Sequence, residues 1–141
     1  YHFEGALAQN TILDQLESLI GQLENTLSVN KKKIYIGGLS MGGMGTFEMV
    51  ARNPNKFAAA FPICGGTNVR FARLLKDTPF WIFHGEADTV VPVTYSKEIY
   101  EALKNLDAEV ALTLYPETGH DSWNNVFKEP GLMPWVFKHS R

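Results

Sequence analysis

The chain has 141 residues, of which 45% are hydrophobic and 20% are charged, and its formal net charge is −2. This composition is ordinary for a folded globular protein and excludes a disordered or strongly basic chain. The length predicts one domain over residues 1–141, large enough to bury a sizeable core. No run approaches the roughly 18 apolar residues of a membrane span, and the weak charge gives no basic patch. We therefore expect neither a membrane nor a nucleic-acid partner.

The chain has one cysteine, Cys64. A single cysteine excludes an intramolecular disulfide and any multi-cysteine metal site, and we expect neither a metal nor a cofactor. Because Cys64 ends an apolar run, we interpret it as a small buried hydrophobe rather than as a second nucleophile. The first residue is Tyr1, not Met, so we expect the natural N-terminus to be absent from this sequence.

The first half of the chain predicts a helix, a strand and a second helix. Apolar residues recur at steps of three and four between about Leu7 and Leu27, which indicates an amphipathic helix. Residues 34–37 are typical of a short buried strand, and a helix is expected from Met41 to Arg52, where Asn-Pro stops it. The helical stripe consists of Leu13, Leu16, Ile20, Leu23 and Leu27.

The second half continues the alternation. Residues 58–63 form an apolar run whose periodicity fits either helix or strand, and its position between turns favours a strand. A clearer strand covers 80–83, a helix 93–106 and a fourth strand 110–115. A final helix includes residues 135–137. Strands apolar on both faces that alternate with helices predict an α/β fold with about four parallel strands flanked by helices.

The motif G-x-S-x-G occupies residues 38–42, directly between a predicted strand and a predicted helix. In that context the motif predicts a sharp turn that exposes Ser40 as a nucleophile and strains its backbone. Only small residues should fit at its two glycines, while Gly43 and Gly45 should let the helix pack on the strand. The backbone N–H of Met41 would then point at a developing oxyanion. The alternative is a glycine-rich phosphate loop, but neither phosphate-loop pattern is present.

A serine nucleophile needs a base, and the fold orders the triad as serine, acid, histidine. His120 lies in a turn just past the last predicted strand, where it could reach Ser40. His84 ends a strand core, and a histidine there more often hydrogen-bonds the loop that follows it. His2 and His139 lie near the termini, away from the expected position. His120 is therefore the predicted base.

The acid should follow another strand. Asp88 lies in the loop after the 80–83 strand, and Glu86 in the same loop remains the second candidate. Asp121 is adjacent to His120, so its side chain is badly placed to meet the ring. Asp77 precedes its strand. We predict Asp88 as the acid.

Three segments carry a family resemblance: IYIGGLSMGGMGTFEMVARNPNKFAAAFPICGG, PFWIFHGEADTVVPV and YPETGHDSW. Together they resemble the dienelactone-hydrolase-like esterases, the phospholipase/carboxylesterase or predicted-peptidase group, over essentially the whole chain. The resemblance implies an α/β-hydrolase fold with Ser40 as nucleophile, Asp88 as acid, His120 as base and Met41 as an oxyanion donor. It also implies hydrolysis of small-molecule carboxylic esters, with feruloyl and acetyl esters of plant polysaccharides among the expected substrates.

Members of this fold carry further strands before the serine, including the loop that supplies a second oxyanion amide. Here about one helix precedes Ile34, so we expect the C-terminal portion of the fold, with the front strands missing. An apolar strand edge needs a partner. The expectation is a companion N-terminal segment or a homo-oligomer.

Two further functional interpretations stay open. A triad does not distinguish leaving groups, so a serine peptidase or thioesterase of the same fold fits the same residues. A non-catalytic interaction module would keep the fold and lose activity. Trp123, three residues after the predicted base, is a candidate substrate-binding residue, whereas Trp81 is expected in the core.

Overall fold

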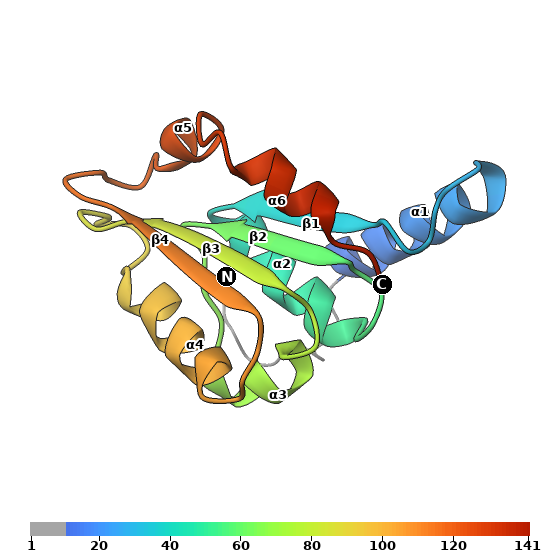
Figure 1. The fold of residues 1–141 in the computed structure, drawn as a ribbon, viewed down its shortest axis with the longest axis horizontal. Helices are drawn as coiled ribbons and strands as arrows, with labels where there is room; N and C mark the ends of the chain where they lie inside the picture. Colours follow the sequence, from blue (N-terminus) through green and yellow to red (C-terminus); the bar gives the residue numbers. More distant parts are fainter. Residues whose placement is uncertain (1–10) are drawn as a thin grey trace.

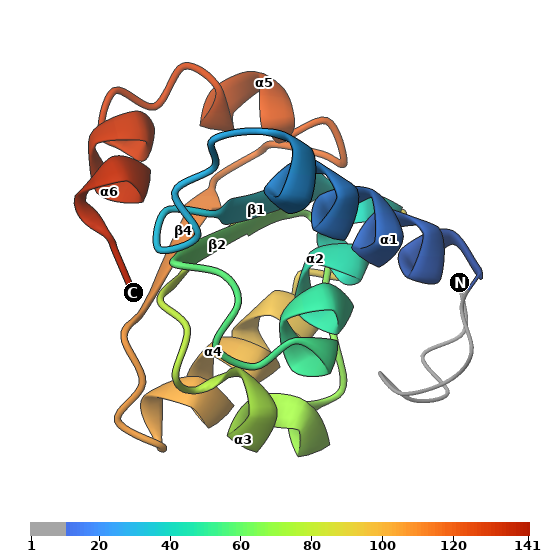
Figure 2. The same ribbon diagram turned by 90° about the vertical axis from the view of Figure 1, so that its right-hand side faces the viewer.

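The computed structural model describes residues 11–141 as a four-stranded parallel sheet with helices on both faces (Figures 1 and 2). The strands lie in the order β1-β2-β3-β4, so each crossover moves the chain one strand along the sheet. The elements in chain order are α1 (Thr11–Thr26), β1 (Tyr35–Leu39), α2 (Met41–Arg52), β2 (Ala59–Ile63), η1 (Val69–Phe71), α3 (Ala72–Leu75), β3 (Phe80–Gly85), α4 (Thr94–Lys104), β4 (Val110–Tyr115), α5 (Trp123–Val126) and α6 (Leu132–Lys138).

The predicted α/β alternation is confirmed, and the apolar run at 58–63 is a strand, β2. Strand β1 continues past the predicted residue 37 to Leu39. The short segments η1, α3 and α5 were not predicted, because three or four residues are too few to establish a helical period. No helix among residues 11–141 is long and apolar enough to cross a membrane.

Hydrophobic side chains pack on both faces of the sheet, as a parallel sheet requires. One cluster lies under α2, α3 and α4, and the other lies under α5 and α6 (Figure 1). The largest fully buried side chains of the first cluster are Phe47, Met49, Phe57, Leu75, Phe80, Ile82, Ile99 and Leu103.

Helix α1 lies beyond β1 and against α2 (Figure 2). The residues of its predicted apolar stripe are partly buried and partly exposed. Leu13 is buried in the first cluster and Ile20 packs against it, but Leu16, Leu23 and Leu27 are exposed. Ion pairs tie this helix to the end of α2, with Arg52 Nη1 at 2.8 Å from Asp14 Oδ1. The predicted helix is present over Thr11–Thr26, and only one side of α1 meets the described core. Residues 7–10 of the predicted helix lie outside the described residues.

The pairing of the parallel strands brings the residues of the candidate site to one edge of the sheet. Leu39 pairs with Ile63 at the end of β1, and Gly85 pairs with Tyr115 at the end of β3. The carboxyl ends of the strands therefore meet at one edge of the sheet, where ligands bind in open α/β sheets.

Candidate active site

The turn between β1 and α2 holds Ser40 in a strained conformation, with φ 54° and ψ −119°. This is the strain that the nucleophile-elbow motif predicts. The turn is tied to the next strand by the Ser40 N–H, which donates to the Ile63 carbonyl at 2.9 Å. A Cβ on Gly38 would lie 2.3 Å from the Gly42 carbonyl oxygen, so the backbone on the two sides of Ser40 passes in close contact.

The glycines of the elbow differ in what they do. A Cβ on Gly43 would lie 2.6 Å from the Ile63 carbonyl oxygen, so the predicted close packing of helix on strand is present there. The predictions for Gly42 and Gly45 are wrong. A Cβ on Gly42 would meet no atom within 4 Å, and one on Gly45 would meet only Leu13 of α1, at an ordinary 3.7 Å.

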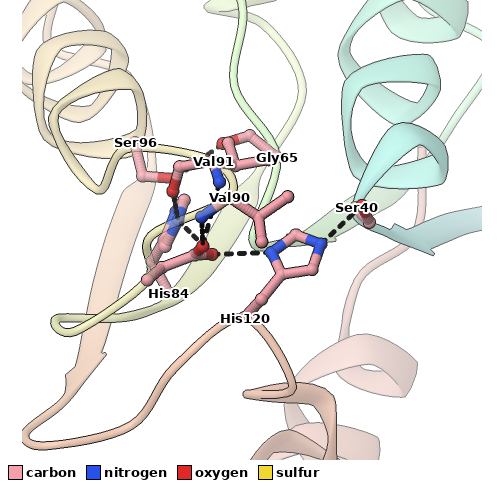
Figure 3. A network of polar contacts seen from close by, with 8 residues as sticks. Ser40, Gly65, His84, Val90, Val91, Ser96 and His120 are labelled. Atoms are coloured by element: carbon pink, nitrogen blue, oxygen red, sulfur yellow. Dashed lines mark hydrogen bonds and ion pairs between the residues drawn. The ribbon is translucent and has the colours of Figure 1, made fainter.

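Three side chains from three different loops form a hydrogen-bonded chain (Figure 3). Ser40 Oγ lies 2.7 Å from His120 Nε2, and His120 Nδ1 lies 2.8 Å from Asp88 Oδ2. The loops follow β1, β4 and β3 respectively. The structure thus brings together the serine, histidine and aspartate that the sequence predicts, in the geometry of a nucleophile, a base and an orienting acid.

The Asp88 carboxylate is buried and saturated with donors. Oδ1 accepts the backbone N–H groups of Val90 and Val91, each at 2.9 Å. Burial raises the pKa of Asp88, but hydrogen bonds from His120 and from those two amides outweigh it, and the net pKa is lowered. An ionised Asp88 accepts a hydrogen bond from His120 Nδ1–H and so leaves the Nε2 lone pair free for the Ser40 hydroxyl.

The competing candidates lie elsewhere. The Glu86 carboxylate is exposed and pairs with Lys97 at 3.8 Å. Asp121 is exposed and contacts Asn124. His139, after α6, is bonded to the Trp135 carbonyl and to Glu109. The remaining histidine candidate near a terminus, His2, lies outside the described residues.

His84 is fully buried at the end of β3, and its Nε2 lies 2.9 Å from the Val91 carbonyl oxygen. The prediction that this histidine bonds the loop that follows it is therefore confirmed. Sequence reasoning missed a further contact, between His84 Nε2 and Asp88 Oδ2 at 3.2 Å. The sequence signal for this contact was the spacing of His84 and Asp88, four residues apart on either side of Gly85, which ends β3.

The oxyanion donor predicted at Met41 is the first residue of α2. The N–H groups of a helix's first turn have no acceptor within the helix, and the helix dipole favours negative charge there. Met41 is 61% exposed, so solvent reaches this residue at the start of α2.

Cys64 lies beside the triad. Its Sγ, a carboxylate oxygen of Asp88 and a ring nitrogen of His120 lie within 4.8 Å of one another, the one such group of potential metal ligands within residues 11–141. Burial raises the pKa of the Cys64 thiol, which disfavours the thiolate that a metal or a nucleophile needs. Asp88 and His120 are already bonded to each other.

Trp123 begins α5 and stands edge-to-face against the His120 ring, with centroids 5.6 Å apart and planes at 86°. It is half-buried. Trp81 packs in the second cluster, and its indole N–H donates to Thr113 Oγ1 at 2.9 Å, in agreement with its predicted place in the core.

Comparison with known proteins identifies the relatives of this chain. A thermostable esterase of known structure superimposes with a TM-score of 0.91 at 35% identity, over 94% of this chain and 38% of that one. The acyl-protein thioesterase 1 of Neurospora crassa is 31% identical over 110 residues, 72% of this chain and 44% of that protein. A bifunctional acetylxylan esterase/xylanase of Neocallimastix patriciarum, XynS20E, is 34% identical over 77 residues, 54% of this chain and 11% of that protein.

The chain thus spans less than half the length of each of these relatives. The family model described as phospholipase/carboxylesterase matches residues 6–129. With a parallel sheet flanked by helices and a nucleophile elbow after β1, the chain belongs to the phospholipase/carboxylesterase family of α/β-hydrolases.

Proposed function

We propose that the protein is a serine carboxylic-ester hydrolase that works through an acyl-enzyme, with Ser40, His120 and Asp88 as its triad. The observation that carries the proposal is the 2.7 Å contact between Ser40 Oγ and His120 Nε2, on a ring whose other nitrogen meets a buried carboxylate. A strained serine at a helix N-terminus beside an oriented base is the arrangement that acyl transfer needs.

In the first half of the reaction, Ser40 Oγ attacks the ester carbonyl carbon while His120 Nε2 takes the hydroxyl proton. The carbonyl oxygen becomes an oxyanion and accepts the Met41 N–H at the positive end of α2. Collapse of the tetrahedral species breaks the bond to the alcohol oxygen. His120 gives its proton to that oxygen, and the alcohol leaves.

In the second half, water attacks the acyl-enzyme and His120 takes one of its protons. The tetrahedral species collapses again, the acid is released and the proton returns to Ser40 Oγ. Asp88 stays ionised throughout and holds His120 with its proton on Nδ1 in the resting state. No step requires a cofactor.

Acetyl and feruloyl esters are the substrates we assign first. The relative from Neocallimastix patriciarum, an acetylxylan esterase by name, supports an acetyl ester. The half-buried Trp123 ring beside His120 offers an aromatic surface for the acyl or alcohol group. A thioester is the second candidate, because one of the relatives named above is an acyl-protein thioesterase.

The decisive experiment treats the protein with a fluorophosphonate probe and identifies the modified peptide by mass spectrometry. The expected label is on Ser40, and the Ser40→Ala protein should stay unlabelled. An unlabelled parent protein would instead indicate a non-catalytic interaction module. Initial rates on p-nitrophenyl acetate, methyl ferulate and an acyl thioester then separate the ester from the thioester assignment.

The open side of β1 bears on activity. No strand within residues 11–141 pairs with the outer edge of β1, and an apolar groove of about 280 Å³ runs between α1, β1 and α2 as far as Met41. Backbone groups on such an edge need partners. We assign the edge and groove to a companion N-terminal segment that adds strands beside β1, as the greater length of the relatives suggests. The same segment would supply a second oxyanion amide.

A further inference from the structure

His84 is a buried histidine that the proposed reaction does not use. It lies on β3, four residues before Asp88, with none of its side chain exposed. Its ring reaches three different parts of the fold: the catalytic-acid loop, helix α4 and, through α4, the end of β2 (Figure 3). A buried polar ring with every nitrogen bonded has a defined orientation.

The contacts of Nε2 determine where one hydrogen lies. Nε2 is 2.9 Å from the Val91 carbonyl oxygen, and a carbonyl oxygen can only accept. Nε2 therefore carries a hydrogen, in the neutral ring and in the charged ring alike. The same N–H faces Asp88 Oδ2 at 3.2 Å, so it is shared between the carbonyl and the carboxylate.

The other nitrogen is held by α4. Nδ1 lies 2.7 Å from Ser96 Oγ, and Ser96 is fully buried. Burial lowers the pKa of His84 more than its contacts with Val91 and Asp88 raise it, so the ring is neutral near pH 7. In a neutral ring with its hydrogen on Nε2, Nδ1 accepts the hydroxyl hydrogen of Ser96. Ser96 Oγ also lies 3.2 Å from the Gly65 carbonyl oxygen, just past β2, and its single hydrogen is shared between this longer contact and the 2.7 Å contact to Nδ1.

Apart from His120, the Asp88 carboxylate thus has hydrogen-bond donors on both of its oxygens. Two backbone amides occupy Oδ1, and His84 occupies one side of Oδ2. The remaining direction at Oδ2 is the one taken by His120 Nδ1, at 2.8 Å. With its other acceptor sites filled, the carboxylate cannot rotate without losing buried hydrogen bonds, each of which is costly to leave unmade.

We propose that His84 is a positioning residue for the catalytic acid: held by Ser96 and the Val91 carbonyl, its Nε2–H fixes the Asp88 carboxylate in the orientation that meets His120. This inference rests on the proposed triad.

A second consequence concerns charge. A donor on Oδ2 shares the negative charge that Asp88 otherwise directs at His120, so His84 moderates the basicity of the catalytic ring. Without this donor, the carboxylate stabilises the charged form of His120 more strongly. The acid limb, that is, the fall in kcat/KM on the acidic side of its pH profile, should then move to higher pH. The titratable groups in contact with this cluster are Asp88, the two histidines and the Cys64 thiol.

The test compares four variants in the active protein. His84→Leu removes both ring nitrogens, His84→Gln keeps a donor near the Nε2 position, and Ser96→Ala removes the hydroxyl that holds Nδ1. His139→Gln is the matched control, a histidine bonded away from the triad. We expect His84→Leu to lower kcat by about tenfold to a hundredfold, as loss of other supporting hydrogen bonds does, with KM within about twofold.

Three further results are expected. His84→Gln should recover most of the lost kcat, Ser96→Ala should show a smaller loss, and His139→Gln should match the parent. The acid limb should move up by a few tenths of a pH unit in His84→Leu. Loss of kcat with no displacement of this limb, or no recovery in His84→Gln, would overturn the proposal.

A double-mutant cycle separates positioning from mere stability. If His84 acts through Asp88, replacing it in an Asp88→Asn background should cost little more activity. Fully additive losses would mean that His84 supports the fold and does not act on the acid. Urea denaturation of each variant shows which proteins are folded. If His84→Leu does not fold, the smaller loss of kcat expected for Ser96→Ala tests the proposal in its place.

The ring itself is observable without any substrate. In ¹H–¹⁵N spectra of the histidine-labelled parent at neutral pH, His84 should show its hydrogen on Nε2 and His120 on Nδ1. A hydrogen found only on His84 Nδ1 would overturn the proposal. If the protein proves inactive toward esters, the proposed function fails, while these spectra still decide how His84 and Asp88 are bonded.

Discussion

His84, on β3, and His120, in the loop after β4, approach the same oxygen atom, Oδ2 of Asp88. His84 Nε2 lies 3.2 Å from it and His120 Nδ1 lies 2.8 Å from it. The two neutral rings must therefore carry their hydrogens on different nitrogens, Nε2 in one and Nδ1 in the other. The difference leaves His120 Nε2 as an acceptor for Ser40, whereas His84 Nε2 is turned inward to the Val91 carbonyl.

Replacing Ser40 with alanine should abolish ester hydrolysis and leave the fold intact. A triad member typically supplies about three orders of magnitude or more in rate, and the Ser40 side chain is bonded to His120. Initial rates on p-nitrophenyl acetate measure the loss, and exposed Ser28→Ala is the control. A Ser40→Ala protein that retains more than about a tenth of the parental rate would not have lost its nucleophile.

Asp88→Asn should be far more damaging than Glu86→Gln. The side-chain amide introduced by Asp88→Asn can donate to His120 Nδ1 and so favours the wrong tautomer, with an expected loss in kcat of about 10⁴-fold. Glu86 is exposed and pairs with Lys97, so its replacement should change kcat by less than about twofold. Steady-state kinetics of both variants test the assignment. The reverse ranking would move the acid to Glu86.

Activity should fall as the pH drops below neutral, because a protonated imidazole can no longer accept the Ser40 proton. The pKa of Asp88 is lowered by hydrogen bonds from His120 and the Val90 and Val91 amides, which outweigh its burial. Asp88 therefore stays ionised over this range, and the limb should have the slope of a single proton. A profile of kcat/KM that is flat from about pH 5 to pH 8 would contradict a histidine base.

The stability of the fold should depend on pH through His84. Burial lowers the pKa of His84, so below the unfolded value of about 6.5 the unfolded chain takes up a proton that the folded protein does not. The contribution of neutral His84 to the free energy of unfolding is complete above about pH 6.5 and is lost as the pH falls toward the lowered pKa of the folded protein. The slope can reach about 1.4 kcal/mol per pH unit. His84→Gln should flatten this dependence in urea denaturation between pH 5 and 8. If the free energy of unfolding changes with pH equally in the parent and in His84→Gln, His84 is not the source of the dependence.

A final prediction concerns the uncovered side of α1 and β1. The 141-residue chain alone should self-associate or bind a companion segment, and should be a poor esterase until the β1 edge is covered. One missing oxyanion amide costs about 3 kcal/mol, a hundredfold or more. Leu16→Lys with Leu19→Lys, two exposed positions of α1, should abolish association in light scattering, whereas Leu74→Lys, an exposed position of α3, should not.

Light scattering can show either self-association or a monomer, and the two results lead to different conclusions. Association between identical chains would show that a second copy covers the edge in place of a companion segment. A monodisperse monomer with full esterase turnover would contradict the need for any cover, and some group within residues 1–33 would then have to replace the second amide.

Local sequence was sufficient for the order of the four strands and the longer helices, and for the residues of the candidate site. Alternating apolar segments predict the parallel sheet, because strands buried on both faces are apolar throughout. The motif at residues 38–42 predicts the strain at Ser40, since its meaning depends only on the strand before it and the helix after it. Chain order then selects Asp88 and His120, because every strand of such a sheet ends at the same edge.

Tertiary structure decided what depends on packing between distant segments. Only the assembled fold shows that α1 buries Leu13 but exposes Leu16 and Leu23, since periodicity gives a helix's apolar residues and not what they face. It likewise places Ser96 of α4 against His84, and both histidines against one oxygen of Asp88. Such contacts arise from the register of β3 with its neighbours and from the docking of α4, and hydrogen-bond partners at that range leave no periodic signal in the sequence.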